Sequence, residues 1–220
     1  MPQKFPFTLY WYRSSNNFAK YIDSYLQGKI HFSSWKAVND PMEGYFLYCP
    51  HRDSISTLIG EKSKIKICCF SKCYSNYLLW SYYAEDHSGV CIEYEVNELP
   101  ENVFKRCVKY RKTIPTFDRT KTDKMQAIDC LIHKLSFWRM EEEIRLLSYD
   151  IPCSDMKIGE MKSITIGRRF FDRIGDQDHS KICNHLRDFM RDNPDFPIYQ
   201  IMDISSDGTM ERAITTNFSL

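Results

Sequence analysis

The stretch FWRMEEEIRLL, from Phe137 to Leu147, places three successive glutamates between an aromatic pair and a run of apolar residues. In a helix, Glu141 and Arg145 would form an ordinary ion pair between residues four apart. In a strand the side chains alternate between two faces, and this alternation favours a strand here. The face expected to line a surface or a cleft carries Glu141, Glu143 and Arg145. The face expected to enter the core carries Glu142 near its start, then Ile144, Leu146 and Ser148.

Two carboxylates on one face of a strand have a specific chemical use. Glu141 and Glu143 would stand roughly 7 Å apart. Such a pair can bind a ribose hydroxyl and stabilise an oxocarbenium-like transition state. Glu143 is then the main candidate, with Glu141 as a supporting carboxylate and Arg145 as the partner that orients Glu143. The alternative is that the glutamates form a solvated strand edge.

Length and composition indicate one medium-sized domain, because the chain has 220 residues of which 43% are hydrophobic and 15% aromatic. The net charge is only +1, so a nucleic-acid partner would need a local basic patch. No stretch approaches the roughly 18 apolar residues of a membrane span, and the first residues do not have the pattern of a signal peptide. We therefore expect a cytoplasmic protein, without membrane contact, whose cysteines are reduced.

The nine cysteines include a set with a loosely zinc-like spacing, C-x3-C-x13-H-x3-C, made of Cys69, Cys73, His87 and Cys91. Cys91, however, lies within an alternating run, and the paired C-x2-C knuckles of structural zinc sites are missing. Buried free thiols are the alternative interpretation. We therefore expect no metal ligands in this chain.

Strands outnumber helices in the expected order and do not alternate regularly with them, which predicts an α+β domain with a mixed or antiparallel sheet and flanking helices. Strands are expected at Thr8–Ser14, Ile30–Ser34, Lys64–Ser71, Gly89–Val96, Asn102–Tyr110, Ser163–Gly167 and Phe196–Ile204, the fourth and fifth as neighbours. Helices are expected at Asn16–Lys29, Asn76–Asp86, Thr120–Phe137 and Ser180–Asn193. The apolar stripe of the third helix would be Met125, Ile128, Leu131, Ile132 and Leu135. A single catalytic domain is expected over residues 1–205, and a weakly specified tail over 206–220.

A basic segment from Lys105 to Lys124 is interleaved with aromatic residues, a composition that suits the backbone and bases of a single strand. Tyr110 and Phe117 are the aromatic residues expected to stack. The residues expected to bind nucleic acid are Lys105, Arg106, Lys109, Arg111 and Lys112. The alternative is a solvated connector that keeps the domain soluble.

The run YRSSNNFAKYIDSYLQGKIHFSS, from Tyr12 to Ser34, resembles the opening of the ADP-ribosyltransferase fold. In that fold a strand bearing His or Arg precedes a helix, and a Gly then leads into a strand with an aromatic–Ser or aromatic–Ala pair. Arg13 matches the first of these motifs. Phe32–Ser33 matches the second, and Ser34 is the other choice for its Ser. Glu143 matches the catalytic glutamate of the Glu-x-Glu motif. The resemblance implies an ADP-ribosyltransferase-like fold with NAD as its cofactor.

A second resemblance extends from Tyr12 to Ile201 and concerns a bacterial family known only as a domain of unknown function. It is carried by the segments YRS, IHFSSWKAVNDPMEG, CCFS, LLWSYYAEDHSGVCIEY and FWRMEEEIRLL. Members of that family are often associated with phage defence and abortive infection. Toxins that ADP-ribosylate RNA or DNA are the relatives that this likeness suggests.

Together the resemblances imply an NAD-dependent ADP-ribosyltransferase toxin of anti-phage defence or a toxin–antitoxin system. Its acceptor would be a nucleic acid, RNA rather than DNA, and an antitoxin protein would be a further partner. The catalytic residues implied are Glu143, Arg13 and Glu141. The residues implied to bind NAD are Tyr12, Arg13, Ser14, Phe32, Ser33, Ser34, Asn39, Trp80 and Tyr83.

Within that interpretation Arg13 offers its planar charged fork to the pyrophosphate or the adenosine ribose. Ser33 binds the nicotinamide ribose, and Trp80 or Tyr83 stacks on nicotinamide. The loop at Asn39–Pro41 is at least a turn and would gate the pocket. The plainer alternatives are a structural ion pair for Arg13 and core positions for the two aromatic residues.

Two other functions compete with this one. A metal-dependent nuclease would use scattered acidic residues such as Glu43, Asp53 and Glu93. A non-catalytic sensor or interaction domain of a defence system would use the aromatic loops to bind a partner.

Overall fold

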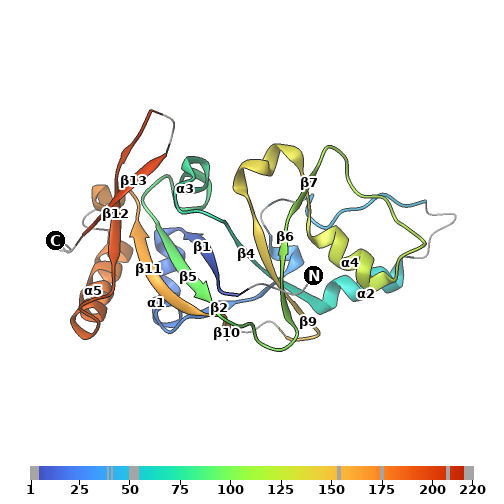
Figure 1. Ribbon diagram of the computed structural model, residues 1–220, viewed down its shortest axis with the longest axis horizontal. Coiled ribbons are helices and arrows are strands. Elements are labelled where there is room, and N and C mark those ends of the chain that lie inside the picture. Colours follow the sequence, from blue (N-terminus) through green and yellow to red (C-terminus); the bar gives the residue numbers. More distant parts are fainter. Residues whose placement is uncertain are drawn as a thin grey trace. The chain divides into compact units, whose positions relative to one another are not determined.

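Helices and strands follow one another irregularly along the chain, as Figure 1 shows for the computed structural model of the protein. The structure describes residues 5–38, 40, 42–49, 55–152, 155–173, 176–206 and 209–215. The helices are α1 (Ser15–Leu26), α2 (Ser56–Lys64), α3 (Tyr77–Tyr83), α4 (Asp123–Leu131) and α5 (Gln177–Asp192), with 3-10 turns η1 (Trp35–Ala37), η2 (Ser136–Glu141) and η3 (Phe170–Arg173). The strands are β1 (Phe7–Arg13), β2 (Lys29–His31), β3 (Ser33–Ser34), β4 (Ile65–Phe70), β5 (Val90–Val96), β6 (Val103–Cys107), β7 (Lys109–Arg111), β8 (His133–Leu135), β9 (Ile144–Tyr149), β10 (Asp155–Lys157), β11 (Glu160–Ile166), β12 (Ile198–Ile204) and β13 (Met210–Ile214).

The expected α+β class, with mixed and antiparallel sheets, is confirmed. Contacts between residues divide the chain into two compact units. Unit 1 comprises Met1–Lys29, Ser71–Glu98 and Lys157–Leu220, and unit 2 comprises Ile30–Phe70 and Leu99–Met156. The expectation of one catalytic domain over residues 1–205 stays a prediction. In the part of the chain that the structure describes, no helix has the length and apolar character needed to cross a membrane.

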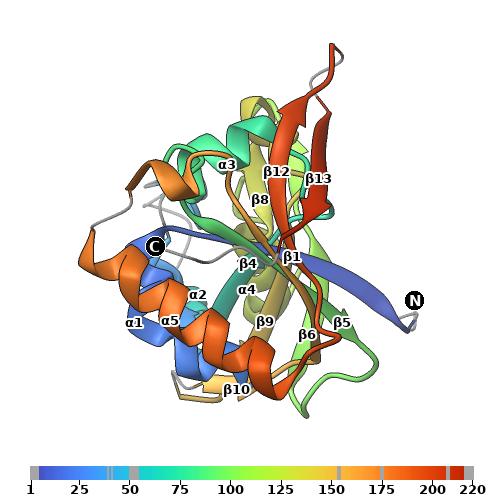
Figure 2. The same ribbon diagram turned by 90° about the vertical axis from the view of Figure 1, so that its left-hand side faces the viewer.

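Unit 1 is built on a five-stranded sheet of order β1-β5-β11-β12-β13, in which only β11 and β12 run parallel. Helices α1 and α5 lie side by side against each other (Figure 2). Alternation along β1 directs Trp11 to Tyr25 of α1 and Tyr12 to Trp80 of α3, with ring centroids 4.9 and 5.3 Å apart. Helices therefore cover both faces of β1, and Trp11 and Tyr12 are both buried.

Unit 2 contains an antiparallel sheet of order β3-β4-β9-β6 and a short parallel pair, β7 with β8. Helices α2 and α4 pack against each other beside it. Their apolar faces and the sheet share one core cluster, formed by Leu58, Ile65, Ile67, Ala127, Leu131, Ile132 and Leu147. In β9 the residues from Ile144 to Ser148 are all buried, so both faces of this strand are covered.

Three local expectations were wrong. Strand β6 was expected beside β5 but pairs with β9, because the chain passes into unit 2 at Leu99. The helix expected at Thr120–Phe137 ends at Leu131, since His133–Leu135 form β8 beside β7. Met125, expected in the apolar stripe, is 55% exposed. Within the tail expected to be weakly specified, Met210–Ile214 form β13.

Candidate functional site

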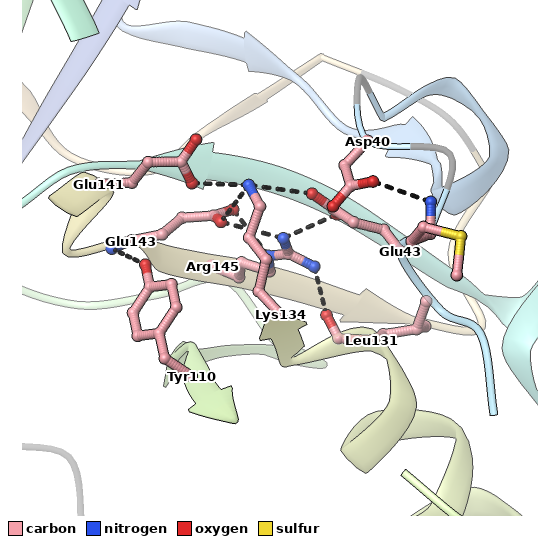
Figure 3. A network of polar contacts seen from close by, with 9 residues as sticks. Asp40, Glu43, Tyr110, Leu131, Lys134, Glu141, Glu143 and Arg145 are labelled. Atoms are coloured by element: carbon pink, nitrogen blue, oxygen red, sulfur yellow. Dashed lines mark hydrogen bonds and ion pairs between the residues drawn. The ribbon is translucent and has the colours of Figure 1, made fainter. Parts of the chain in front are cut away.

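Five charged side chains from separate segments of unit 2 meet in its interior (Figure 3). We call this set the carboxylate network: Glu43, Lys134, Glu141, Glu143 and Arg145. Each is buried, with between 0 and 6% of its surface exposed. Buried charges of this density are expensive, so they point to a functional site more often than to a source of stability.

The local backbone explains how two of three successive glutamates point inward. Glu141 ends η2, and Glu142 then adopts the left-handed conformation with φ of 44°. This residue turns the chain into β9, so that Glu142 is exposed while both of its neighbours are buried. The backbone of Glu143 is held on both sides, because its N–H donates to the Tyr110 hydroxyl at 2.8 Å and its carbonyl accepts from Val108 N–H at 3.0 Å.

Arg145 is the fully buried centre of the network, with 0% of its surface exposed. Its Nε and Nη2 donate to the two oxygens of Glu143 at 2.7 and 3.0 Å, a bidentate geometry. Nη2 also lies 2.7 Å from Glu43 Oε2, and Nη1 donates to the Leu131 carbonyl at 2.6 Å. The guanidinium therefore fixes the orientation of Glu143, as the sequence predicted.

Lys134, which lies in β8, forms ion pairs with all three carboxylates of the network. Its Nζ lies 2.6 Å from Glu141, 3.1 Å from Glu43 and 3.3 Å from Glu143, and 4.9 Å from the ring centre of Trp138. The contact with Glu143 is the longest of the three. Lys134 was expected in a helix but lies in β8, and its role was not predicted, since a lysine in an apolar run gives no sign of its partners.

The charges of the network do not cancel, because three carboxylates face two cations. Burial opposes ionisation of Glu143, but Arg145 and Lys134 outweigh burial and lower the pKa of Glu143 from 4.5 to about 2. Burial raises the pKa of Glu43 against the opposing effect of Arg145. Despite burial, the carboxylates raise the pKa of Lys134. Glu143 is thus held ionised, whereas burial works in favour of the protonated form of Glu43.

A shallow depression of about 10 Å³, room for about one water molecule, lies in unit 2 and is lined partly by Asp40, Tyr45, His133 and Lys134. Burial, together with the nearby cations Arg111 and Lys109, lowers the pKa of His133, so its ring is neutral at pH 7. Lys134 is the member of the network that lines this depression.

The residues expected at the Glu-x-Glu motif are brought together, but in an interior cluster and not along an open cleft. Glu141, Glu143 and Arg145 meet as expected, and Glu142 lies outside the network. The expectation that their face lines a surface or cleft was wrong because η2 and β8 fold over it and supply Lys134.

The residues expected to bind NAD are divided between the units. In unit 1, Arg13 donates to the Tyr25 hydroxyl at 3.2 Å and stacks on Trp11, and Ser14 caps α1. Tyr12 and Trp80 belong to a buried core cluster, and Tyr83 packs on it. Arg13 therefore has aromatic partners, and among the residues that the structure describes it does not form the ion pair considered as its plainer alternative.

In unit 2, Phe32 is buried, and Ser33 and Ser34 pair with β4. Ser33 lies across β4 from Leu147, whereas Glu143 directly precedes β9. Ser33 and Glu143 are therefore offset by four residues, roughly 13 Å along the strands. Asn39 lies outside the described residues.

Of the residues expected to bind nucleic acid, some already contact other side chains of the protein and others are exposed. Lys109 forms an ion pair with Asp129 at 3.0 Å, and Arg106 stacks on Phe104. Arg111 and Lys112 are exposed, and Lys105 is half-buried. Tyr110, expected to stack on bases, accepts from the Glu143 backbone, and Phe117 packs on the unit 2 core.

The described acidic and thiol residues that were considered for metal binding do not form a cluster that could hold a metal ion. Among the residues that the structure describes, no three His, Cys, Asp or Glu are arranged to hold a metal ion. Cys69 hydrogen-bonds to Glu143 in unit 2, whereas Cys73, His87 and Cys91 belong to unit 1. Of the nuclease candidates, Glu43 joins the network, Glu93 binds Ser163 in unit 1, and Asp53 lies outside the described residues.

Comparison with known families finds a similarity over residues 79–146, to the family described as "Protein of unknown function (DUF2971)". That segment carries Lys134, Glu141, Glu143 and Arg145 but not Glu43. The expected likeness to a domain of unknown function is confirmed over this segment. Neither the curated proteins nor the solved structures gave a match.

Proposed function

We propose that the protein is a cytoplasmic, NAD-dependent ADP-ribosyltransferase whose catalytic carboxylate is Glu143 and whose acceptor is a nucleic acid, RNA rather than DNA. Its biological setting would be a toxin of anti-phage defence, restrained by an antitoxin. The observation that carries the proposal is the state of Glu143, a carboxylate kept ionised and oriented beside a second buried glutamate.

The chemistry of the transfer requires such a carboxylate. The bond between the ribose C1 and the pyridinium nitrogen of NAD breaks, and its electron pair leaves with nicotinamide. The acceptor forms a new bond to C1, and its proton passes to solvent. A fixed negative charge lowers the energy of the oxocarbenium-like state between these two events. Glu143 supplies that charge at neutral pH, because Arg145 and Lys134 keep it ionised.

Access for the ribose would come through Lys134. Its ammonium makes the longest contact to Glu143, 3.3 Å, and it lines the depression beside the network. A ribose hydroxyl that replaced this contact would bind Glu143 Oε2 and leave the bidentate bond from Arg145 in place. Lys134 would keep its bond to Glu141, at 2.6 Å.

A nucleic-acid acceptor is supported by the basic surface of the same unit. Arg111 and Lys112 are exposed on and after β7, and Arg106 is exposed on β6. Strand β7 also carries Tyr110, whose hydroxyl holds the backbone of Glu143. The expected phosphate contacts and the candidate carboxylate are therefore linked through one short strand.

The direct test is incubation of the purified protein with NAD labelled in the adenylate phosphate, together with single-stranded RNA, single-stranded DNA or cell lysate. We expect label to enter RNA, and Glu143→Gln to abolish the transfer. The matched control is Glu142→Gln, which changes the exposed neighbour and should retain activity. Absence of transfer to every acceptor, or full transfer by a folded Glu143→Gln variant, would refute the proposal. Cleavage that EDTA abolishes and NAD does not affect would indicate the nuclease instead.

A non-catalytic binding module is the second candidate, and one observation favours it. Both oxygens of Glu143 already accept hydrogen bonds from Arg145, and one of them also contacts Lys134. A carboxylate occupied in this way is well suited to a structural role. This candidate predicts no toxicity on expression and no transfer, and it predicts that Glu143→Gln changes stability alone.

A further inference from the structure

A second buried cation, Lys62, lies in unit 2 outside the carboxylate network. It belongs to α2 and is 4% exposed, on the helix face that also buries Leu58. In the part of the chain that the structure describes, no carboxylate forms an ion pair with it. A lysine is almost never buried without such a partner, so the burial of Lys62 needs a physical explanation.

The contacts of Lys62 lead to the turn that follows Glu43. Its Nζ donates to the Gly44 carbonyl at 2.5 Å. The ammonium also lies 3.8 Å from the ring centre of Trp35 and 5.4 Å from that of Phe46. One carbonyl and two aromatic faces therefore replace the water around this cation.

Lys62 is a poor source of stability in this environment. Burial lowers its pKa, which means that the ammonium is less favourable here than it is in water. An apolar side chain of similar length would fill the same space without that desolvation cost. The role of Lys62 therefore lies in the turn that it holds through the Gly44 carbonyl.

The turn held by Lys62 is tightly packed around Gly44. Gly44 has φ of +73°, and a Cβ there would lie 3.2 Å from both Leu131 Cδ2 and Lys62 Nζ. On the other side of the turn, the N–H of Glu43 donates to the Asp40 carbonyl at 3.0 Å. Glu43 is thus fixed between a turn bond before it and the Lys62 bond directly after it. Its side chain then reaches Lys134 at 3.1 Å and Arg145 at 2.7 Å.

We propose that Lys62 is a positioning residue for Glu43: through the Gly44 carbonyl, its ammonium seats the turn that brings Glu43 into the carboxylate network. Its effect on ADP-ribosyl transfer rests on the proposed function, whereas its effect on the turn does not. Glu43 comes from outside the segment that matches the family model. Lys62 therefore couples α2 to the one member of the network that the loop contributes.

The test compares Lys62→Met with Lys64→Met. Met keeps the apolar stem of Lys62 and removes its donor and charge. Lys64 is on the same helix but is largely exposed and pairs with Glu61, so its variant controls for loss of a charge from α2. Hydrogen exchange would be measured by mass spectrometry across residues 42–47, where the amides of Glu43, Tyr45 and Leu47 are hydrogen-bonded.

In Lys62→Met we expect exchange in residues 42–47 to accelerate about tenfold, the size expected for loss of one charged hydrogen bond. Exchange in β9 and the unfolding midpoint should not fall, because a costly buried charge has been removed. In ¹³C-glutamate NMR, with the signal assigned through Glu43→Gln, the pKa of Glu43 should fall towards its ordinary value as the turn opens to water. Lys64→Met should change none of these.

Unchanged exchange in residues 42–47 and an unchanged Glu43 titration in a folded Lys62→Met variant would overturn the inference. A merely structural lysine would instead lower the unfolding midpoint and leave the Glu43 titration unmoved. If the wild-type protein transfers no ADP-ribose but Lys62→Met opens the turn, the proposed function fails and the positioning role stands. If transfer is observed and Lys62→Met retains it with a closed turn, the positioning role fails alone.

Discussion

Replacement of Arg145 by Met should be the most damaging change of a single charge in unit 2. The wild-type network opposes three carboxylates with two cations, and Arg145→Met leaves three carboxylates with Lys134 alone. Removing one partner of a buried pair costs about 3–5 kcal/mol, because the remaining charge stays buried and uncompensated. Met keeps an unbranched apolar stem, so the loss of charge dominates over the loss of volume.

The titration of Glu143 yields a second estimate of the same effect. Its pKa is lowered from 4.5 to about 2. At about 1.4 kcal/mol per pH unit this corresponds to about 3 kcal/mol of stability at pH 7. A lowered carboxyl pKa contributes stability above the unfolded value and loses it as the pH falls through the folded value. The contribution should therefore decline from pH 4.5 downward and be roughly halved at pH 3.

Urea denaturation followed by circular dichroism would measure the free energy of unfolding at pH 7 and pH 3, with hydrogen exchange of Ile144–Tyr149 as the probe of unit 2. Glu142→Gln is the matched control and should stay within about 0.5 kcal/mol of wild type. Glu143→Gln, which leaves two carboxylates with two cations, should cost less than Arg145→Met. The reasoning would be refuted by an Arg145→Met cost below about 1 kcal/mol at pH 7, or by a cost as large at pH 3 as at pH 7.

Three further outcomes follow from particular contacts. Tyr110→Phe leaves the buried backbone N–H of Glu143 without its acceptor and should cost about 1–3 kcal/mol in urea denaturation; a neutral effect would contradict the assigned bond. Thr122→Ala removes the N-cap of α4 and should cost about 1 kcal/mol, measured in the same way. Arg111→Ala should weaken binding of single-stranded RNA in fluorescence anisotropy and lower the salt slope by about one, whereas Lys109→Ala should do less because Lys109 is already paired. Equal effects of the two would exclude a role for prior pairing.

Local periodicity was sufficient for most of the elements. The apolar spacing of α1, the aromatic content of β1 and the alternation along β5 predicted those elements to within three residues at each end. It failed after Leu131, where an apolar run continues with the same composition but changes from helix to strand. Pairing with β7, which is remote in sequence, decides that change, and no local pattern records it.

The candidate site was predictable only in part. Glu141, Glu143 and Arg145 lie close together in the sequence, and the sequence predicted that they share a face. The structure brings the two glutamates together by a left-handed turn at Glu142 before β9, not by the strand alternation that was expected. Lys134 and the role of Glu43 could not be predicted, because their positions depend on β8 and on a turn from a distant segment. The burial of Lys62 was the least predictable feature, since a lysine in a polar helix is expected to be exposed to solvent. Only the folded chain places Trp35 and Phe46 around it.

By itself, the sequence determined the α+β class, most element positions and the orientation of Glu143 by Arg145. These follow from interactions between residues a few positions apart. Only the tertiary structure decided that the glutamates are buried, that Lys134 and Glu43 complete their network, and that Lys62 holds the Gly44 turn. Burial of a charge depends on which distant groups replace its water, and that is a property of the folded chain and not of any one segment.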